Sequence, residues 1–407
     1  MFDRDRGYTC WERRDRGVGR DTTAPHRPAT DGYSARIARA SKFLSRWMLG
    51  LLLASYALAA FLPASAVWGT ELHFGESSLL GEPGRITLSM VLLTLLLFNV
   101  GLDIPLTHLG DQVRKPGLLL AGLGANLVFP VFYIAGLALF LGDGGAVASL
   151  ILGLALIASM PIAGSSAAWA QTANGNMALT LGLILCSTVL SPLTTPVLLH
   201  SVGWLTRGDY SAGLDALANS GTSMFLSLFV LLPATLGLIV RRLVGDGRVS
   251  RVKPTLKLLN SVILLLLTYT NASTSLPGVV AQPDWRLLLL ALFGALGMCV
   301  LSFAVGWILA RFMRAGAGDC TALMFGLGMN NNGTGLVFAA TVLRHMPEVM
   351  LPVICYNLIQ HVIAGAVTHL TGRPMAAPVT APMVAPATVA PSMLVSHPES
   401  MPIRIAS

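Results

Sequence analysis

The stretch that decides the fold reads Phe325-Gly326-Leu327-Gly328-Met329-Asn330-Asn331-Asn332-Gly333-Thr334-Gly335 and interrupts a long hydrophobic segment. Its four glycines, three consecutive asparagines and one threonine make a poor continuous transmembrane helix. In lipid an unpaired backbone group is costly, so such an interruption persists only where protein, water or a bound ion satisfies it. Three adjacent asparagines point in three directions around a helix, so a single helix–helix packing face does not account for them all.

The composition is that of a membrane protein. Hydrophobic residues make up 54% of the 407 residues and charged residues only 11%, whereas a typical soluble chain carries about 25% charged residues. Eleven of the 27 Lys and Arg residues precede Trp47. Because the basic residues flank apolar segments, the net charge of +8 does not indicate a nucleic-acid partner. We therefore expect a polytopic protein whose surroundings are a lipid membrane.

Ten hydrophobic segments follow one another, each long enough to cross the hydrocarbon core as a helix. The sequence therefore predicts an all-α membrane protein with ten transmembrane helices. The expected segments are 47–68, 86–106, 117–141, 146–172, 177–201, 222–242, 255–280, 286–312, 319–343 and 347–371.

Lysine and arginine in the connecting loops predict the orientation, since cytoplasmic loops carry more of them. With the N-terminus inside, the inner loops hold ten basic residues and the outer loops four. We therefore expect both termini on the cytoplasmic side of the inner (plasma) membrane. The inner set is Arg114, Lys115, Arg241, Arg242, Arg248, Arg251, Lys253, Lys257, Arg311 and Arg314, and the outer set is Arg85, Arg207, Arg286 and Arg344.

Ten segments divide into two halves of five, which must have opposite orientations because five is odd. A polar stretch after the fifth segment is the expected junction, and both ends of the chain have compositions typical of disorder. The expected organisation is a basic cytoplasmic tail at 1–45, a first five-helix repeat at 46–201, a linker at 202–221, a second five-helix repeat at 222–371 and an Ala/Pro-rich tail at 372–407.

The fourth segment of each half carries an interruption, which supports the repeat. In the first half it reads Ser159-Met160-Pro161-Ile162-Ala163-Gly164-Ser165-Ser166. Pro161 removes an amide, and the Gly and Ser residues after it can reroute the freed carbonyls. Paired interruptions at matching positions are the best pointer in a sequence to a transport site. We expect the fourth and ninth segments to be discontinuous helices that frame a solute site.

Neutral oxygen atoms concentrate at both interruptions. Half-helix N-termini favour an anionic group, whereas C-terminal carbonyls and side-chain oxygens favour a cation such as Na⁺. The candidate oxygen donors are Asn330, Asn331, Asn332 and Thr334 at one interruption, and Ser165, Ser166 and Thr180 near the other.

Other polar side chains lie inside apolar segments. We interpret Asn99, Asn126 and Asn357 as partners in interhelical hydrogen bonds, each worth about 0.6–2 kcal/mol. An ionisable group inside the membrane is a candidate for function, and His361 either relays protons, contacts a substrate or packs as a neutral ring. The remaining polar residues of this kind are Tyr269, Asn271 and Gln360.

Motifs of enzyme active sites are absent from the sequence. It has no phosphate loop ending in Lys-Ser/Thr, no His-Glu-x-x-His and no Gly-x-Ser-x-Gly. The five cysteines have neither metal-ligand nor disulfide spacing. We therefore predict no enzymatic activity and no cofactor.

Several motifs resemble the bile acid:sodium symporter family and its bacterial members, over roughly residues 47–371. The second interruption, Gly328–Gly333, is similar to the family's Gly-Met-Gln-Asn-x-Gly, and Phe98–Leu102 resembles its Met-Gly-Leu segment. The most specific part lies between Pro161 and Pro196, where Gly175–Thr180 is similar to Gly-Asp-x-Ala-Leu-Ser and Ser187–Pro196 to Ser-Thr-x-x-x-Pro-x-x-Thr-Pro.

The resemblance implies two inverted five-helix repeats, with crossed helices four and nine in a core domain and a panel domain of helices one, two, six and seven. It also implies Na⁺-coupled uptake of a small organic anion, bile-acid-like or carboxylate, by alternating access, and no particular oligomeric state. For the ion we assign Ser166, Thr180, Met329, Asn330 and Asn331, and for the substrate Asn332, Thr334, Asn271 and His361.

The chain departs from the family at the expected sodium ligands. Gly326 stands where a glutamate is expected, Ala167 replaces an asparagine and Ile184 a hydroxyl residue. Loss of the carboxylate removes the formal charge that offsets Na⁺, so the first alternative is an uncoupled carrier, or a proton-coupled one that uses His361. The second is a non-transporting membrane receptor or scaffold. Arsenite export, as in the related arsenical-resistance family, is disfavoured because the first interruption has no cysteine.

Overall fold

The computed structural model describes residues 32–62, 73–77, 84–104, 116–142, 144–205, 214–215, 217–219, 221–343 and 346–370. The expected tail at 372–407 and residues 1–31 of the other tail lie outside this range. The elements are α1 (Gly32–Phe61), β1 (His73–Ser77), β2 (Gly84–Thr87), α3 (Leu88–Asp103), α5 (Pro116–Leu141), α6 (Gly145–Ser159), α7 (Ser165–Thr172), α8 (Met177–Leu205), α10 (Thr222–Leu226), the π-helical turn η2 (Ser227–Leu231), α11 (Leu232–Val244), α12 (Asp246–Ala272), α13 (Leu276–Ala281), α14 (Trp285–Phe312), α15 (Ala317–Gly328), α16 (Asn332–Val342), the 3₁₀ turn η3 (Pro347–Val349) and α17 (Met350–Leu370).

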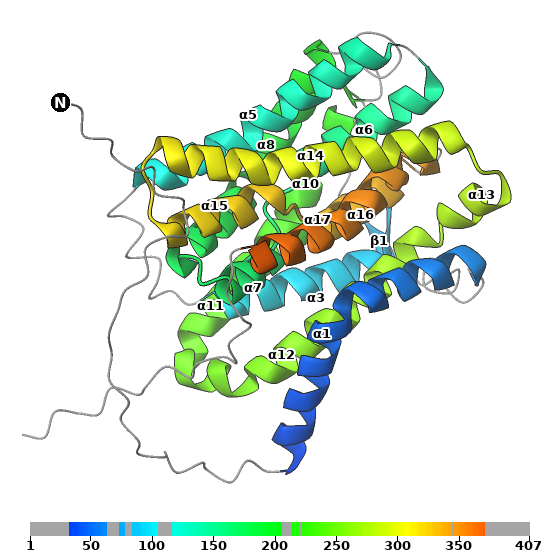
Figure 1. Cartoon of the computed structure of the whole chain (residues 1–407). Helices are drawn as coiled ribbons and strands as arrows, with labels where there is room; N and C mark the ends of the chain where they lie inside the picture. Colours follow the sequence, from blue (N-terminus) through cyan, green and yellow to red (C-terminus); the bar gives the residue numbers. More distant parts are fainter. Residues whose placement is uncertain are drawn as a thin grey trace, which may run out of the picture. The chain divides into compact units, whose positions relative to one another are not determined.

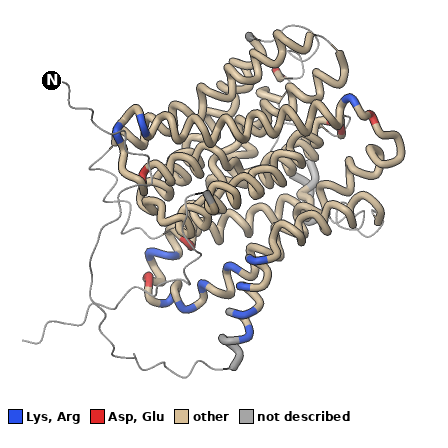
Figure 2. Tube along the Cα trace, viewed as in Figure 1, with Lys and Arg blue, Asp and Glu red and all other residues tan. Residues whose placement is uncertain are grey.

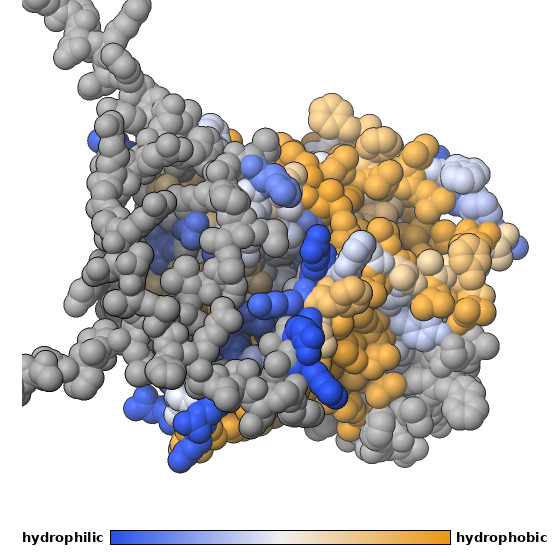
Figure 3. All heavy atoms as spheres, turned by 60° about the horizontal axis from the view of Figure 1, so that its bottom comes forward, coloured by the Kyte–Doolittle hydropathy of each residue, from blue (hydrophilic) through white to orange (hydrophobic). Residues whose placement is uncertain are grey.

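The described helices are those of a multi-pass membrane protein. Six are long and apolar enough to cross a membrane, and three more are shorter and apolar. Large hydrophobic side chains cover broad areas of the outer surface (Figure 3), and Phe140, Trp204 and Phe312 are 85–90% exposed. Such a surface is unfavourable in water and suits the hydrocarbon of a bilayer.

The helices pack in two groups (Figure 1). In the panel group, α1 packs on α12, and α3 packs on α11 and α12. In the core group, α14 packs on α15, α17, α5 and α6, and α5 packs on α8. Both interrupted segments, α6–α7 and α15–α16, belong to the core group.

The panel group is held by a close helix crossing between α3 and α11. A Cβ added at Gly101 would collide with the Ala234 carbonyl oxygen, and one at Gly237 with the Phe98 carbonyl oxygen. These glycines therefore let the two backbones touch, as small residues do in membrane helix pairs. Arg241 of α11 adds a hydrogen bond between the two helices, since its Nη1 donates to the Leu102 carbonyl oxygen of α3 at 2.6 Å.

Several boundaries differ from the sequence expectation. Helix α1 begins at Gly32, so residues 32–45 are helical and not part of a disordered tail. The basic residues of this stretch recur among alanines and other helix-compatible residues, a pattern that carries no apolar stripe and so gives no span signal. The hairpin of β1 and β2, which pair antiparallel, was not expected in an all-α chain.

Basic residues gather in α1, around the α11–α12 connection and at the end of α14 (Figure 2). In Figure 2 these positions lie toward the left and lower side of the view. Most basic residues of the described helices therefore lie in the same region of the structure.

We predict that Gly237→Ala destabilises the protein, because the added Cβ forces α3 and α11 apart. Overpacking of this kind costs about 1–3 kcal/mol. The matched control is Gly124→Ala in α5, where a Cβ would meet nothing within 4 Å. Thermal unfolding in detergent should show a lower Tm for Gly237→Ala and an unchanged or higher Tm for Gly124→Ala. Equal Tm values would contradict the close crossing.

Candidate functional site

The first interruption separates α6 from α7. Pro161 has no amide proton, and the Ile162 amide, which a continuous helix would give to the Ala158 carbonyl, donates instead to Ser187 Oγ on α8 at 3.1 Å. Helix α7 then begins at Ser165. The chain therefore leaves helical geometry for a few residues without leaving the interior of the protein, since Met160 and Ile162 are each 1% exposed.

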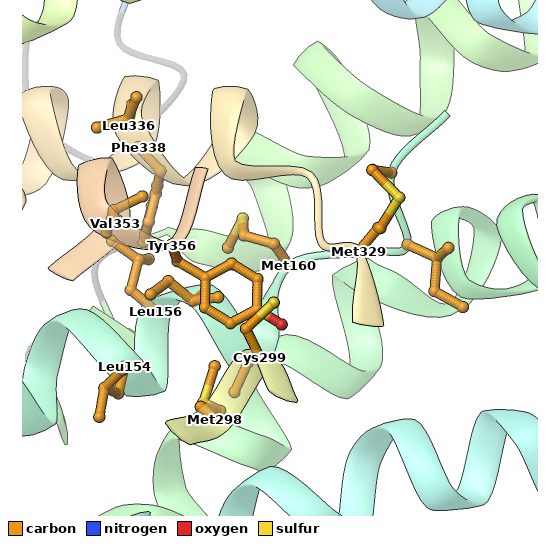
Figure 4. Close-up of a cluster of buried hydrophobic side chains, with 14 of the residues drawn as sticks. Leu154, Leu156, Met160, Met298, Cys299, Met329, Leu336, Phe338, Val353 and Tyr356 are labelled. Atoms are coloured by element: carbon orange, nitrogen blue, oxygen red, sulfur yellow. The ribbon is translucent and has the colours of Figure 1, made fainter. Parts of the chain in front are cut away.

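The second interruption separates α15 from α16. The last carbonyl of α15, that of Gly328, accepts from Tyr356 Oη at 3.2 Å and from Cys299 Sγ at 3.8 Å. Figure 4 shows the Tyr356 and Cys299 side chains. Asn331 caps α16, because its Oδ1 accepts from the Thr334 amide at 3.3 Å. Side chains from α14 and α17 and one asparagine of the break itself thus satisfy several of the groups that the missing helical turn leaves free.

The two interruptions cross and bond to each other. The Ala163 amide donates to the Met329 carbonyl at 2.9 Å, and the Asn331 amide donates to the Pro161 carbonyl at 2.9 Å. Ile162 and Asn330 thereby form an isolated antiparallel bridge. The prediction that both segments are broken and meet is confirmed, and part of the freed backbone is paired within the protein.

Four side-chain atoms at the second interruption have no hydrogen-bond partner among the described residues. They are Asn330 Oδ1, Asn332 Oδ1, Asn332 Nδ2 and Thr334 Oγ1. Their residues are at most 3% exposed. An unpaired buried polar atom costs about 1–3 kcal/mol, and native proteins keep few of them. Four within five residues therefore make this interruption a candidate site for a bound solute.

Residues of the panel group face both interruptions. A Cβ at Gly164 would lie 3.1 Å from Val100 Cγ2 of α3, and a Cβ at Gly333 would lie 3.3 Å from Leu267 Cδ2 of α12. The candidate site is therefore bounded by the crossed breaks on one side and by α3 and α12 on the other.

The residues predicted for an ion lie at the crossing with one exception. Ser166 Oγ donates to the Ala163 carbonyl at 2.7 Å, and the Ala163 amide in turn bonds Met329. Thr180 is fully buried in α8, but its hydroxyl donates to the Asn176 carbonyl one turn earlier at 2.9 Å. No contact described here joins Thr180 to the crossing.

The other two predicted substrate residues are already hydrogen-bonded. Asn271 Nδ2 donates to the Leu267 carbonyl at 2.9 Å, which places it one turn from the Gly333 contact. His361 Nδ1 accepts from Trp169 Nε1 at 3.3 Å, so it lies against α7. Trp169 also stacks on Phe325, with ring centroids 6.5 Å apart. Both residues flank the site without touching its unpartnered atoms in any contact described here.

The structure shows what lies beside Gly326, where the family resemblance predicts a glutamate. A Cβ at Gly326 would lie 2.9 Å from Leu183 Cδ1, so a leucine of α8 fills the space that a longer side chain would need. Ile184, next along α8, is 2% exposed. Among the described residues, Arg241 is the one Asp, Glu, Lys or Arg that is buried, and it belongs to the α3–α11 contact. The site is built from neutral groups.

The interpretation of three buried asparagines as interhelical partners is confirmed at two. Asn99 Nδ2 donates to Asn260 Oδ1 at 2.9 Å, and Asn357 Nδ2 donates to Tyr56 Oη at 2.9 Å. It is wrong for Asn126, which makes no hydrogen bond within the described ranges. Asn126 instead lines a small cavity behind the first interruption, together with Pro161.

Sequence reasoning missed the role of Gln360. Its Oε1 accepts from the Asn330 amide at 3.1 Å, which ties α17 to the second interruption. The available signal was its spacing from Asn357, because residues three apart on a helix share a face. Two amides on one face of an apolar span indicate a polar partner opposite.

These features define a multi-pass membrane protein with a candidate solute site inside its helix bundle. Residues 90–282 match the sequence model of the Sodium Bile acid symporter family. This match covers slightly less than half of the chain, which is therefore similar to a family of sodium symporters.

Two proteins of Bacillus subtilis (strain 168) are similar to this chain. One, described as Uncharacterized protein YbaS, is 26% identical over 257 residues, which cover 63% of this chain and 79% of that protein. Another, described as Uncharacterized sodium-dependent transporter YocS, is 24% identical over 253 residues, which cover 61% of this chain and 72% of that protein.

We predict that Thr334→Val raises the stability of the solute-free protein, because it removes a buried hydroxyl that has no partner. The expected gain is about 1–3 kcal/mol. The control is Thr195→Val: Thr195 is equally buried, but its Oγ1 donates to the Ser159 carbonyl at 2.6 Å. Thermal unfolding should move the two variants in opposite directions. A loss of Tm in Thr334→Val like that of the control would show that the hydroxyl is bonded inside the protein.

Proposed function

We propose that this protein is a secondary transporter that couples Na⁺ to the uptake of a small organic anion by alternating access. The observation that carries the proposal is the set of four unpartnered side-chain atoms beside the crossed breaks. Discontinuous helices that meet inside a bundle are the usual site of solute and coupling ion in secondary transporters.

The chemistry of the four atoms favours two solutes of opposite character. Asn330 Oδ1 and Asn332 Oδ1 can only accept, and Thr334 Oγ1 can accept as well. Asn332 Nδ2 can only donate. A cation can bind the three acceptor oxygens, and an anionic oxygen can accept from the amide donor. Neither solute alone therefore provides partners for all four atoms.

For the cation we propose Na⁺ held by neutral oxygens from Ser166, Met329, Asn330 and Asn331, with Thr180 as a more distant member. Support comes from the family and from the relative described as sodium-dependent. With Leu183 in the space beside Gly326, no carboxylate offsets the ion. A co-bound anion would provide that charge, which makes binding of the two solutes interdependent.

For the anion we propose a site where the crossing meets α12. Helices α7 and α16 both begin at the crossing, and helix N-termini favour negative charge. Asn332 and Thr334 are the proposed contacts, with Asn271 and His361 at the border. A small carboxylate or a bile-acid-like anion has the required chemistry.

Transport would require the core group to move against the panel group, since the proposed site lies between them. We propose ten spans in two inverted repeats, with helices α6–α7 and α15–α16 as corresponding pairs. We propose that both termini lie in the cytoplasm, because the orientation rule puts the basic α11–α12 connection on that side.

The test is uptake into proteoliposomes from a panel of bile acids and small carboxylates, with an inward gradient of Na⁺ or of K⁺. The proposal expects uptake that Na⁺ stimulates and K⁺ does not. Equal uptake with both ions would favour an uncoupled carrier. A dependence on pH that His361→Ala removes would favour proton coupling, and no flux of any anion would favour a receptor or scaffold.

We predict that Asn331→Ala and Asn331→Ser both abolish Na⁺-stimulated uptake, because each removes the amide oxygen. Serine keeps a helix-capping oxygen, so Asn331→Ala alone should also lose about 1 kcal/mol of stability. Uptake and Tm are measured on the same preparations. Normal uptake by Asn331→Ser would remove this side chain from the site.

A further inference from the structure

A row of buried side-chain amides runs from the second interruption to α1. The Asn330 amide proton is donated to Gln360 Oε1 at 3.1 Å, Gln360 Nε2 donates to Asn357 Oδ1 at 3.3 Å, and Asn357 Nδ2 donates to Tyr56 Oη at 2.9 Å. All four residues are at most 5% exposed. The row crosses from the core group, through α17, to the panel group.

The hydrogen-bond directions along the row are fixed from one end. A backbone amide can only donate, so Gln360 must turn its oxygen toward Asn330. That orientation leaves its NH₂ group for Asn357, whose own NH₂ group must then face Tyr56. No amide in the row can flip without leaving two donors or two acceptors opposed, so the row has one consistent arrangement.

The row ends on a residue of the candidate site. Asn330 offers its amide to Gln360 and keeps an unpartnered Oδ1. Gln360 therefore holds the backbone from which this side-chain oxygen projects. At the other end, the Asn357–Tyr56 bond joins two helices that belong to different packing groups.

Breaking the hydrogen bond at one end of the row affects the bond at its other end. Because both side chains are buried, separating Tyr56 from Asn357 leaves an amide donor without a partner. Asn357 can then recover a partner only by releasing Gln360, which in turn loosens Asn330. The shape of the break and the contact between α1 and α17 are therefore coupled through three side chains.

We propose that Gln360 is a positioning residue that holds the second interruption ready for its solute, and that the Asn357–Tyr56 bond makes this state depend on contact between the panel and core groups. The role of this row in transport rests on the proposed function. The coupling between the α1–α17 contact and the second interruption is a property of the solute-free protein.

The first arm of the test is hydrogen exchange, read by mass spectrometry on peptides covering 325–335 in detergent. Tyr56→Phe removes one hydroxyl from α1 and should increase exchange of these amides by about fivefold, the effect of one lost hydrogen bond. The control is Tyr133→Phe, which removes a hydroxyl that donates to the Gly294 carbonyl at 2.9 Å inside the core group. Unchanged exchange in Tyr56→Phe, or an equal increase in the control, would overturn the proposal.

The second arm asks whether the row acts as one unit. Asn357→Leu should raise exchange of the same peptides, and Tyr56→Phe combined with Asn357→Leu should add nothing to the larger single effect. Additive effects would show two independent structural contacts and would overturn the row as a coupling device.

The third arm connects the row to the solute, with NaCl as the probe and KCl as its reference. The Na⁺ concentration that gives half of the thermal stabilisation should rise about fivefold in Tyr56→Phe, with the plateau unchanged, because positioning is lost while the ligands stay. An unchanged half-saturation beside a clear wild-type response would overturn the role in solute binding. If the wild type itself shows no Na⁺ response, the proposed Na⁺ coupling fails, and the exchange arms still decide the coupling of α1 to the break.

Discussion

The structure depends on two reciprocal backbone hydrogen bonds, Ala163 to Met329 and Asn331 to Pro161. A break in a transmembrane helix exposes peptide groups that lipid cannot satisfy. Here each break supplies the partner that the other needs, so neither is stable in this form alone. The same pairing brings the ends of four half-helices to one point. The crossing thus pairs backbone groups that the two breaks leave free, and it also forms the candidate solute site.

The backbone hydrogen bonds at the crossing do not satisfy the polar side chains of the second interruption. Several of the freed peptide groups are paired within the protein. Asn330, Asn332 and Thr334 still keep side-chain polar atoms that have no partner among the described residues. Among the residues that the structure describes, no carboxylate is buried, and Leu183 fills the space beside Gly326. A site made only of neutral groups and helix ends binds charge weakly unless solutes of opposite sign arrive together. The lack of a carboxylate at the candidate site distinguishes this chain from the symporter family that its motifs resemble.

The sequence was sufficient to locate the interruptions because Pro161 and the Asn-Gly run conflict with a continuous helix wherever they stand. It also anticipated that the three asparagines would not share one role: Asn330 bonds α17 through its amide, Asn331 caps α16, and Asn332 is unpartnered. Which role falls to which asparagine could not be predicted, since it depends on Gln360 and on the opposing break, distant in sequence. The same limit explains Asn126, whose lack of a partner depends on the packing of α5, α6 and α8. The early start of α1 was missed because a basic helix without an apolar stripe resembles a polar tail.

The crossing can be tested directly by a disulfide between its two bridge residues. Ile162 and Asn330 face each other in an antiparallel bridge without direct backbone bonds between them, a geometry that brings Cα atoms to about 4.5 Å and permits a disulfide. We expect Ile162→Cys combined with Asn330→Cys, in a background without other cysteines, to form the intramolecular disulfide on mild oxidation. Two thiols that stay free under these conditions, and that titrate fully once the protein is unfolded, would contradict it.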